Sequence, residues 1–247
     1  MIPVDFSGQT VVVTGGSAGI GLGIARMFET AGAQVVITGT HDPAHYGDAI
    51  SGLEYHRLDD SCDGDVVAFR ADWGDRPLDV LINAIGTVRY KRQEFQIETF
   101  RFVMDVNLTG VFHLCEIFHQ ALADSAARGN SGSIINIASL ASFNATPNNP
   151  AYSASKGGLA VLTKTLADNW GRKGIRVNGI APGFVASKLT AVSRDNPKIY
   201  DASIKATPLG RWGTPEDMGG VALFLASPLA AFVAGQTIPV DGGMSLS

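Results

Sequence analysis

Tyr152 and Lys156 lie four residues apart in a helix-forming stretch, so their side chains share one face of the predicted helix. A phenol with a pKa of about 10 is a poor base at neutral pH, but a neighbouring ammonium favours the phenolate and lowers that pKa. Such a pair suits proton exchange with an alcohol or carbonyl oxygen. The pair alone is short, and a surface Tyr and Lys at an ordinary helix start remain an alternative.

Two further polar residues could belong to the same site. Ser139 follows the apolar run 134–138, and a hydroxyl at a strand end can polarise a substrate oxygen. Asn107 falls inside a long helical stretch, where asparagine is unfavourable and needs either a bond to the backbone or a role in a site.

A glycine-rich turn follows the first apolar run and opens the first predicted helix. Its sequence, Thr14-Gly-Gly-Ser-Ala-Gly-Ile-Gly21, puts a strand, a loop and a helix N-terminus in the order that anion binding requires. We expect Gly15 to allow a tight turn, Gly19 to let the backbone approach a pyrophosphate and Gly21 to let the helix pack near the strand. The pattern indicates a dinucleotide site, although glycine-rich loops are often only turns.

Short apolar strands alternate with helical stretches along the chain. The predicted strands are Thr10–Thr14, Gln34–Thr38, Leu53–Leu58, Val80–Asn83, Ser133–Ala138, Ile175–Ile180 and Thr237–Val240. The predicted helices include Gly19–Ala31, Thr99–Arg128, Tyr152–Lys173 and Pro215–Leu225. Most strands are continuously apolar, which is typical of a parallel sheet covered on both faces. We predict an α/β fold, a single-domain doubly wound parallel sheet (Rossmann fold) of about seven strands over residues 1–247.

Residues 184–214 connect a predicted strand to a predicted helix through a long segment of weak periodicity. Four residues typical of chain breaks occur in it, Asn196, Pro197, Pro208 and Gly210. Open α/β sheets bind ligands at this end, and long excursions in compact domains are usually functional. We therefore predict a substrate lid, with a plain surface loop as the alternative.

Composition and charge exclude several function classes. The 247 residues carry a net charge of −4, with 45% hydrophobic and 17% charged residues, so we expect neither disorder nor a basic surface for nucleic acid or anionic membrane. The longest apolar run is broken and too short to span a bilayer. Cys62 and Cys115 cannot form a disulfide framework, which favours reduced thiols and a cytoplasmic protein. The five histidines show no metal-ligand spacing, so we expect no metal site.

Taken together, these motifs resemble those of the short-chain dehydrogenase/reductase family over nearly the whole chain, from Gln9 to Gly243. The resemblance implies hydride transfer between a nicotinamide and a substrate carbon, which interconverts a secondary alcohol and a ketone. It implies that Tyr152 is the general acid/base and that Lys156 lowers its pKa and binds the nicotinamide ribose. It also implies that Ser139 orients the substrate oxygen and that Asn107 holds a water in a proton relay.

The same resemblance implies the cofactor contacts. Asp59 matches an acid that contacts adenine, and Pro182-Gly183 matches a turn against the nicotinamide carboxamide. Segment 83–86 departs from the usual Asn-Asn-Ala-Gly in its two middle residues, which we interpret as a change in packing. The expected contacts are Gly15, Ser17, Gly19, Ile20, Gly21, Thr40, Asp59, Asn83, Ala84, Gly86, Tyr152, Lys156, Pro182, Gly183 and Val185.

The sequence leaves the choice between NAD and NADP nearly even. Gly39 stands where NAD sites of this family place an acid, and Ala18 stands where NADP sites often place Arg or Lys. Thr40 and His41 could bond a phosphate, but Asp42 would repel it. We lean slightly to NAD.

The substrate is a small molecule whose identity stays open. Arg89, Lys91 and Arg92 could attract an acidic substrate, or form a solvated charged loop. Asn144, Asn148 and Asn149 could bond a polyhydroxylated substrate, but we favour turn residues. Segments 42–43, 135–143 and 210–217 resemble those of sugar-acid dehydrogenases that act on gluconate-like compounds, so a sugar acid or polyol is our first hypothesis.

Two alternatives to that function remain open. One is a 3-oxoacyl thioester (acyl-carrier) reductase of the same family, which more often carries Arg at the place of Ala18. The other is a catalytically silent nucleotide-sensing protein. Small residues in the helix that begins at Tyr152, and the tail 238–244, resemble the pairing surfaces of the family. We therefore expect a homotetramer, with a dimer second.

Overall fold

The computed structural model describes residues 4–130, 132–187 and 189–246, so the predicted bounds 1–247 include a few residues outside the described ones. Seven parallel strands form one sheet in the order β3-β2-β1-β4-β5-β6-β7. The strands are β1 (Thr10–Thr14), β2 (Gln34–Gly39), β3 (Glu54–Arg57), β4 (Val80–Asn83), β5 (Ser133–Ile137), β6 (Arg176–Pro182) and β7 (Thr237–Val240). This topology confirms the predicted doubly wound sheet.

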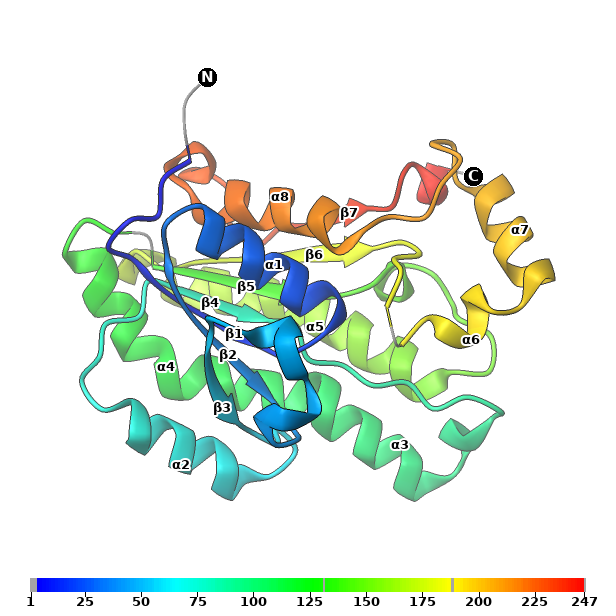
Figure 1. Ribbon diagram of the computed structural model, residues 1–247, viewed down its shortest axis with the longest axis horizontal. Helices are drawn as coiled ribbons and strands as arrows, with labels where there is room; N and C mark the ends of the chain where they lie inside the picture. Colours follow the sequence, from blue (N-terminus) through cyan, green and yellow to red (C-terminus); the bar gives the residue numbers. More distant parts are fainter. Residues whose placement is uncertain (1–3, 131, 188, 247) are drawn as a thin grey trace.

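Helices cover both faces of the sheet (Figure 1). They are α1 (Gly19–Thr30), α2 (Asp63–Trp73), α3 (Ile97–Met104), α4 (Gly110–Ala127), α5 (Pro150–Trp170), α6 (Ala191–Arg194), α7 (Pro197–Ala206) and α8 (Pro215–Ala226). Helices α1 and α8 pack on one face, and α2, α4 and α5 pack on the other. The side chains of β1 alternate accordingly, because Val11 and Val13 join the first core and Val12 joins the second. Burial on both faces explains why central strands such as β1 and β4 are mostly apolar.

The helices differ from the sequence-based expectation in three places. The predicted helix Thr99–Arg128 begins at Ile97 and is interrupted by a single π-helical turn, Asp105–Thr109, between α3 and α4. Helix α2 was not predicted, although Val66, Phe69 and Trp73 follow a helical spacing and are buried. The segment 184–214 contains α6 and α7, so it is more regular than its weak periodicity indicates.

The start of α7 explains the residues typical of chain breaks in the segment 184–214. Asn196 and Pro197 are typical of chain breaks, but here they are the N-cap and first residue of α7. Asn196 Oδ1 accepts from the N–H of Lys198 at 3.1 Å. Lys188, which falls within the predicted lid, lies outside the described residues.

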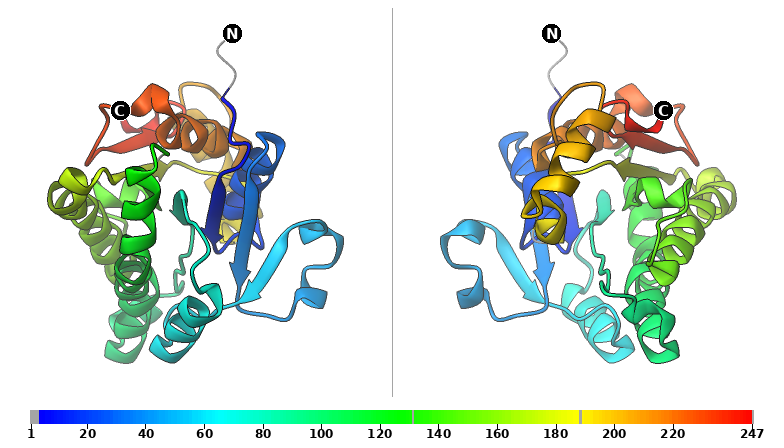
Figure 2. Two further views of the ribbon diagram at one scale, coloured as in Figure 1. Left: turned by 90° about the vertical axis from the view of Figure 1, so that its left-hand side faces the viewer. Right: turned by 90° about the vertical axis from the view of Figure 1, so that its right-hand side faces the viewer.

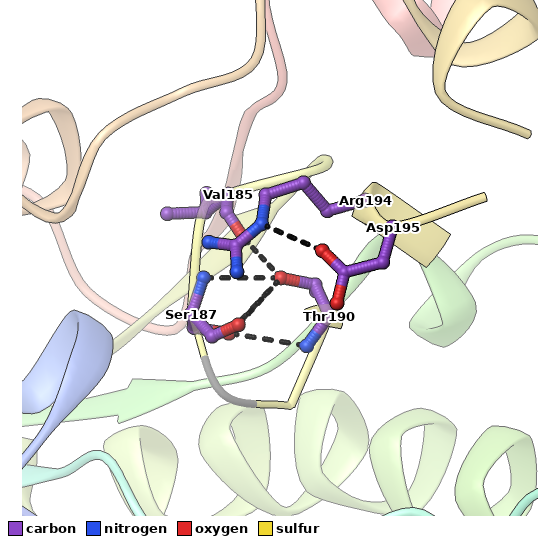
Figure 3. A network of polar contacts seen from close by, with 5 residues as sticks. All are labelled: Val185, Ser187, Thr190, Arg194 and Asp195. Atoms are coloured by element: carbon purple, nitrogen blue, oxygen red, sulfur yellow. Dashed lines mark hydrogen bonds and ion pairs between the residues drawn. The ribbon is translucent and has the colours of Figure 1, made fainter. Parts of the chain in front are cut away.

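Polar contacts join residues near the start of the segment 184–214 (Figure 3). Thr190 Oγ1 donates to the carbonyl of Val185 at 2.6 Å, and the N–H of Ser187 donates to the same Oγ1 at 3.1 Å. Arg194 and Asp195 form an ion pair at 3.4 Å just beyond these contacts.

Strand β3 forms one edge of the sheet, and the segment that carries it projects from the body of the molecule (Figure 2).

Candidate active site

A cavity of about 560 Å³ opens at the carboxyl ends of six neighbouring strands. Its walls come mainly from Gly15 and residues 17–21 after β1, 38–40 at β2, 58–60 after β3, 84–87 and Arg89 after β4, 137–139 at β5, and Pro182, Gly183, Val185, Ser187, Leu189 and Thr190 at and after the end of β6. The order of the strands reverses between β1 and β4, which is the point where open α/β sheets bind ligands. Every predicted catalytic or cofactor residue lines this cavity except Asn83 and Asn107.

The glycine-rich turn brings bare backbone to the cavity wall. Gly15 and Gly19 have φ of 66° and 53°, in the left-handed region that favours glycine. A Cβ on Gly15 would lie 2.9 Å from the carbonyl oxygen of Ala84. Helix α1 has no side-chain cap and no acid in its first turn, so its N-terminus is suited to an anion from outside the helix.

Tyr152, Lys156 and Ser139 meet in the cavity. The Lys156 side chain is buried, its Nζ donates to the carbonyl of Ile137 at 2.8 Å, and it lies 6.0 Å from the centre of the Tyr152 ring. Ser139 lies two residues beyond β5 and lines the same cavity, and its Oγ accepts from the N–H of Ala141 at 3.1 Å. A phenol, an ammonium and a hydroxyl therefore share one wall, which suits proton exchange with a substrate oxygen.

Burial has opposite effects on the two titratable groups of this wall. Burial raises the pKa of Tyr152, and Tyr90 and Glu94 add to this, while the hydrogen bond with Ser139 lowers it. This direction is opposite to the one predicted from Lys156, because burying the phenol disfavours the phenolate. Burial lowers the pKa of Lys156 to about 8, against the attraction of Asp60.

Asn107 is fully buried in the π-helical turn, and its side chain does not line the cavity. Its Oδ1 accepts from the N–H of Thr87 at 2.7 Å, and its Nδ2 donates to the carbonyl of Thr87 at 2.9 Å and to Ser155 Oγ at 3.0 Å. The asparagine thus bonds to backbone, which is one of the two reasons predicted for its place in the helix.

Asn83 belongs to the sheet and not to the cavity wall. Its Nδ2 donates to Asn136 Oδ1 at 2.9 Å, and its Oδ1 accepts from Thr14 Oγ1 at 3.3 Å. This side chain joins three adjacent strands, so the contact predicted between Asn83 and the cofactor stays a prediction. Ala84 and Gly86, later in the same segment, do line the cavity.

Two buried acids at the site were not predicted. Glu94 is fully buried and accepts from the N–H of Tyr152 at 2.9 Å and from the N–H of Arg89 at 2.9 Å. Asp60 lines the cavity, and burial raises its pKa to about 7. Glu94 lies in a charged loop and belongs to no recognisable motif. Asp60 directly follows Asp59, which was the acid expected to contact the cofactor. Neither residue therefore stands out in the sequence.

Gly39, the last residue of β2, stands where NAD sites of the family place an acid, and its surroundings leave little room for a side chain. A Cβ on Gly39 would clash with Ser17 Oγ and would lie 2.7 Å from the Tyr46 hydroxyl. The N–H of His41 donates to that hydroxyl at 3.2 Å. Burial raises the pKa of Tyr46, but hydrogen bonds with Ser17, His41 and others outweigh it and leave it below the usual value. Two hydroxyls thus occupy the place of an acidic side chain.

The basic loop after β4 is divided between the cavity and the surface. Arg89 lines the cavity, and its guanidinium lies 4.8 Å from the centre of the Phe102 ring. Lys91 and Arg92 are exposed and do not line it. The residues Asn144, Asn148 and Asn149 also stay outside the cavity lining.

In residues 4–130, 132–187 and 189–246, no helix is long and apolar enough to cross a membrane. Within the same described ranges, no group of three or more His, Cys, Asp or Glu side chains is placed to hold a metal ion.

Comparison with known proteins identifies the family. Residues 15–245 match the family model described as enoyl-(acyl carrier protein) reductase. The chain is 38% identical to a 2-dehydro-3-deoxy-D-gluconate 5-dehydrogenase of Bacillus subtilis, over 97% of this chain and 95% of that protein. It is 36% identical to a 3-oxoacyl-(acyl-carrier-protein) reductase of Chlamydia pneumoniae, over 98% of this chain and 99% of that protein.

A solved structure of similar sequence carries a nucleotide. It is described as a putative 2-deoxy-D-gluconate 3-dehydrogenase from Agrobacterium tumefaciens with bound NADP. The TM-score is 0.89, with 36% identity over the full length of both chains. The chain therefore belongs to the short-chain dehydrogenase/reductase family. It is an oxidoreductase that acts on CH–OH groups with a nicotinamide dinucleotide.

Proposed function

We propose that this enzyme interconverts the secondary alcohol and the ketone of a sugar acid or related polyol. The observation that carries this proposal is Arg89, which lines the same cavity as Tyr152 and Ser139. A guanidinium is the side chain best suited to hold a carboxylate, through two parallel hydrogen bonds. Among the described residues, Arg89 forms no ion pair with a protein acid. The 38% identical relative named for a gluconate derivative supports the same substrate class.

The catalytic roles follow from the wall formed by three side chains. Ser139 would hold the substrate oxygen by a hydrogen bond, and Tyr152 would give a proton to that oxygen or take one from it. Lys156, held at the carbonyl of Ile137, would stabilise the phenolate as it forms. When bound, the nicotinamide supplies or accepts the hydride. Asn107 would act indirectly, by fixing the loop that carries Arg89.

The residues present fit a dinucleotide, with bare glycine backbone and the N-terminus of α1 for its phosphates. We propose NADP(H) as the preferred form, because Ser17, Thr40 and Tyr46 offer hydroxyl donors where NAD sites offer an acid. The NADP bound to the similar structure from Agrobacterium tumefaciens supports this choice. The slight lean to NAD, which rested on the lack of an Arg or Lys and on repulsion by Asp42, finds no support in the similar structure, which carries NADP.

A 3-oxoacyl thioester reductase is the second candidate, and the 36% identical relative from Chlamydia pneumoniae favours it. The two candidates differ in what Arg89 must hold. A thioester keeps its negative charges far from the reacting carbonyl, whereas a sugar acid carries its carboxylate on the same short chain. A catalytically silent nucleotide-sensing protein would bind the nucleotide and turn over neither compound.

Activity assays with a matched pair of variants test the proposal. Aldonates, their keto forms, neutral polyols and 3-oxoacyl thioesters are offered with NADP(H) and NAD(H). We expect turnover of an aldonate, with KM raised about thirtyfold by Arg89→Met and unchanged by Arg101→Met, an exposed control on α3. Turnover of thioesters alone would move the assignment to the second candidate. Nucleotide binding without turnover of any compound would support the silent protein.

We also propose a homotetramer, with a dimer second, in the cytoplasm. Strand β7 is an edge strand, and Phe232 and Leu246 nearby in the chain are highly exposed apolar residues, which supports pairing through this segment. Gly158 of α5 packs on Leu108 of its own chain, so only part of the small-residue face is available. Light scattering measures the assembly directly.

The proposed location in the cytoplasm is supported by the free thiols of Cys62 and Cys115, because a reducing compartment keeps thiols free.

A further inference from the structure

We propose that Glu94 is a positioning residue that holds Arg89 and Tyr152 at a fixed separation across the active site. Glu94 lies in a 3₁₀ turn, Gln93–Phe95, in the loop before α3, and it is fully buried. Among the described residues it forms no ion pair. A carboxylate with no cation is costly to bury, so its hydrogen bonds must offset that cost.

One carboxylate accepts from three residues and joins two segments of the site, the loop after β4 and the start of α5. Glu94 Oε2 accepts from the N–H of Tyr152 at 2.9 Å, and Oε1 accepts from the N–H of Arg89 at 2.9 Å and from Asn149 Nδ2 at 3.3 Å. Asn149 Nδ2 also donates to the carbonyl of Arg89 at 3.0 Å. Because a carboxylate is small and rigid, its two oxygens set the spacing of the two N–H groups they bind.

The start of α5 depends on this outside acid. Asn149 is the N-cap of α5 but its side chain makes no cap bond, and the first turn contains no acid of its own. Tyr152 lies in that first turn, where unpaired N–H groups and the helix dipole favour a negative charge. Glu94 supplies both the acceptor and the charge, so it fixes the turn from which the Tyr152 side chain projects.

The loop that carries Arg89 contains backbone strain. Lys91 and Arg92 have φ of 57° and 60°, a left-handed conformation that residues other than glycine rarely adopt. Strain of this kind persists where surrounding contacts determine it, and it clusters at functional sites. The bonds from Glu94 to Arg89 and Tyr152 are such contacts, and they hold the loop against α5.

The charge of Glu94 also acts on the Tyr152 phenol. Tyr90 and Glu94 both raise the pKa of that phenol, and the Lys156 ammonium lies 6.0 Å from its ring centre. Removal of the Glu94 charge should therefore lower the pKa of Tyr152. A residue that only stabilised the fold would leave this titration unchanged.

The test compares Glu94→Gln with Glu98→Gln, the same change at an exposed site on α3. A glutamine accepts only through its one oxygen, so one of the two N–H groups loses its partner. We expect E94Q to lower kcat about ten- to hundredfold and to shift the Tyr152 titration to lower pH. The titration is followed by tyrosinate absorbance, as the difference from the same protein carrying Tyr152→Phe. We expect E98Q to change neither quantity.

Glu94→Asp separates geometry from charge, and it also serves if E94Q does not fold. We expect E94D to lower kcat and to leave the Tyr152 pKa unchanged. The aspartate keeps the negative charge, but its side chain is one methylene shorter and reaches the two N–H groups less well. Wild-type kcat in a folded E94Q or in E94D, or an unchanged titration in E94Q, would overturn the proposal. The role of Arg89 rests on the proposed function, but the titration needs no substrate. Failure of aldonates as substrates is therefore distinguishable from failure of this inference.

Discussion

The side-chain amide of Asn107 pairs in both directions with the main chain of Thr87, accepting at 2.7 Å and donating at 2.9 Å. Its Nδ2 also donates to Ser155 Oγ at 3.0 Å. Thr87 lies in the loop after β4, and Ser155 lies in α5, one residue before Lys156. A π-helical turn presents this amide, in agreement with the frequent use of such turns at functional sites.

Loss of this amide should destabilise the protein. Asn107→Leu would leave the half-buried N–H and carbonyl of Thr87 without their side-chain partner, so we expect the free energy of unfolding to fall by about 1–3 kcal/mol. Urea denaturation measures it, with Asn144→Leu as an exposed control. A loss below about 0.5 kcal/mol would show that water replaces the amide, and that Asn107 does not fix the loop.

Tyr46 should influence the choice of cofactor. Tyr46→Phe removes a hydroxyl donor beside Gly39, so we expect affinity for NADPH to fall about tenfold while affinity for NADH changes little. Gly39→Asp, combined with Tyr46→Phe to relieve one of the two close contacts, should favour NADH. Nicotinamide fluorescence titrations give both dissociation constants. Equal losses for the two nucleotides in Tyr46→Phe would exclude a role in selecting the phosphate.

Asp60 should make stability depend on pH. Burial raises its pKa from 3.8 to about 7, so the folded protein binds a proton that the unfolded chain has lost. The stability should therefore fall as pH rises from about 4 to about 7, and stay low above that. Asp60→Asn removes this dependence, and we expect it to be more stable at about pH 8 by about 1–4 kcal/mol.

Urea denaturation across this pH range checks the prediction, with exposed Asp72→Asn as the control. If the free energy of unfolding depends on pH in the same way in the wild type and in Asp60→Asn, Asp60 is ionised in the folded state over this range.

Much of the fold follows from local patterns. Val11, Val12 and Val13 are buried by different helices, and a continuous run of this kind predicts a covered parallel strand. The spacing of Tyr152 and Lys156 on one helix, and of Ser139 at a strand end, likewise predicts which side chains share the cavity. These relationships depend on helix and strand geometry that neighbouring residues determine.

The remaining features depend on contacts between distant segments. Asn83 ends a strand beside residues that line the cavity, but its side chain points into the sheet toward Thr14 and Asn136. Tyr46 reaches Ser17 from a loop whose path no periodicity predicts. Glu94 binds Tyr152 across 58 residues of sequence. Such pairs are determined by loop conformation and burial, which a single sequence does not display.

The most direct test of the account compares wild-type protein with Tyr152→Phe in two measurements. Nicotinamide fluorescence gives the affinity for NADPH, and absorbance gives the turnover of an aldonate or its keto form. We predict that the variant binds NADPH within about twofold of the wild type and loses activity by about 10²–10⁴-fold, because only the proton-exchanging hydroxyl is removed. Turnover that survives in Tyr152→Phe would contradict the assignment of Tyr152 as the general acid/base.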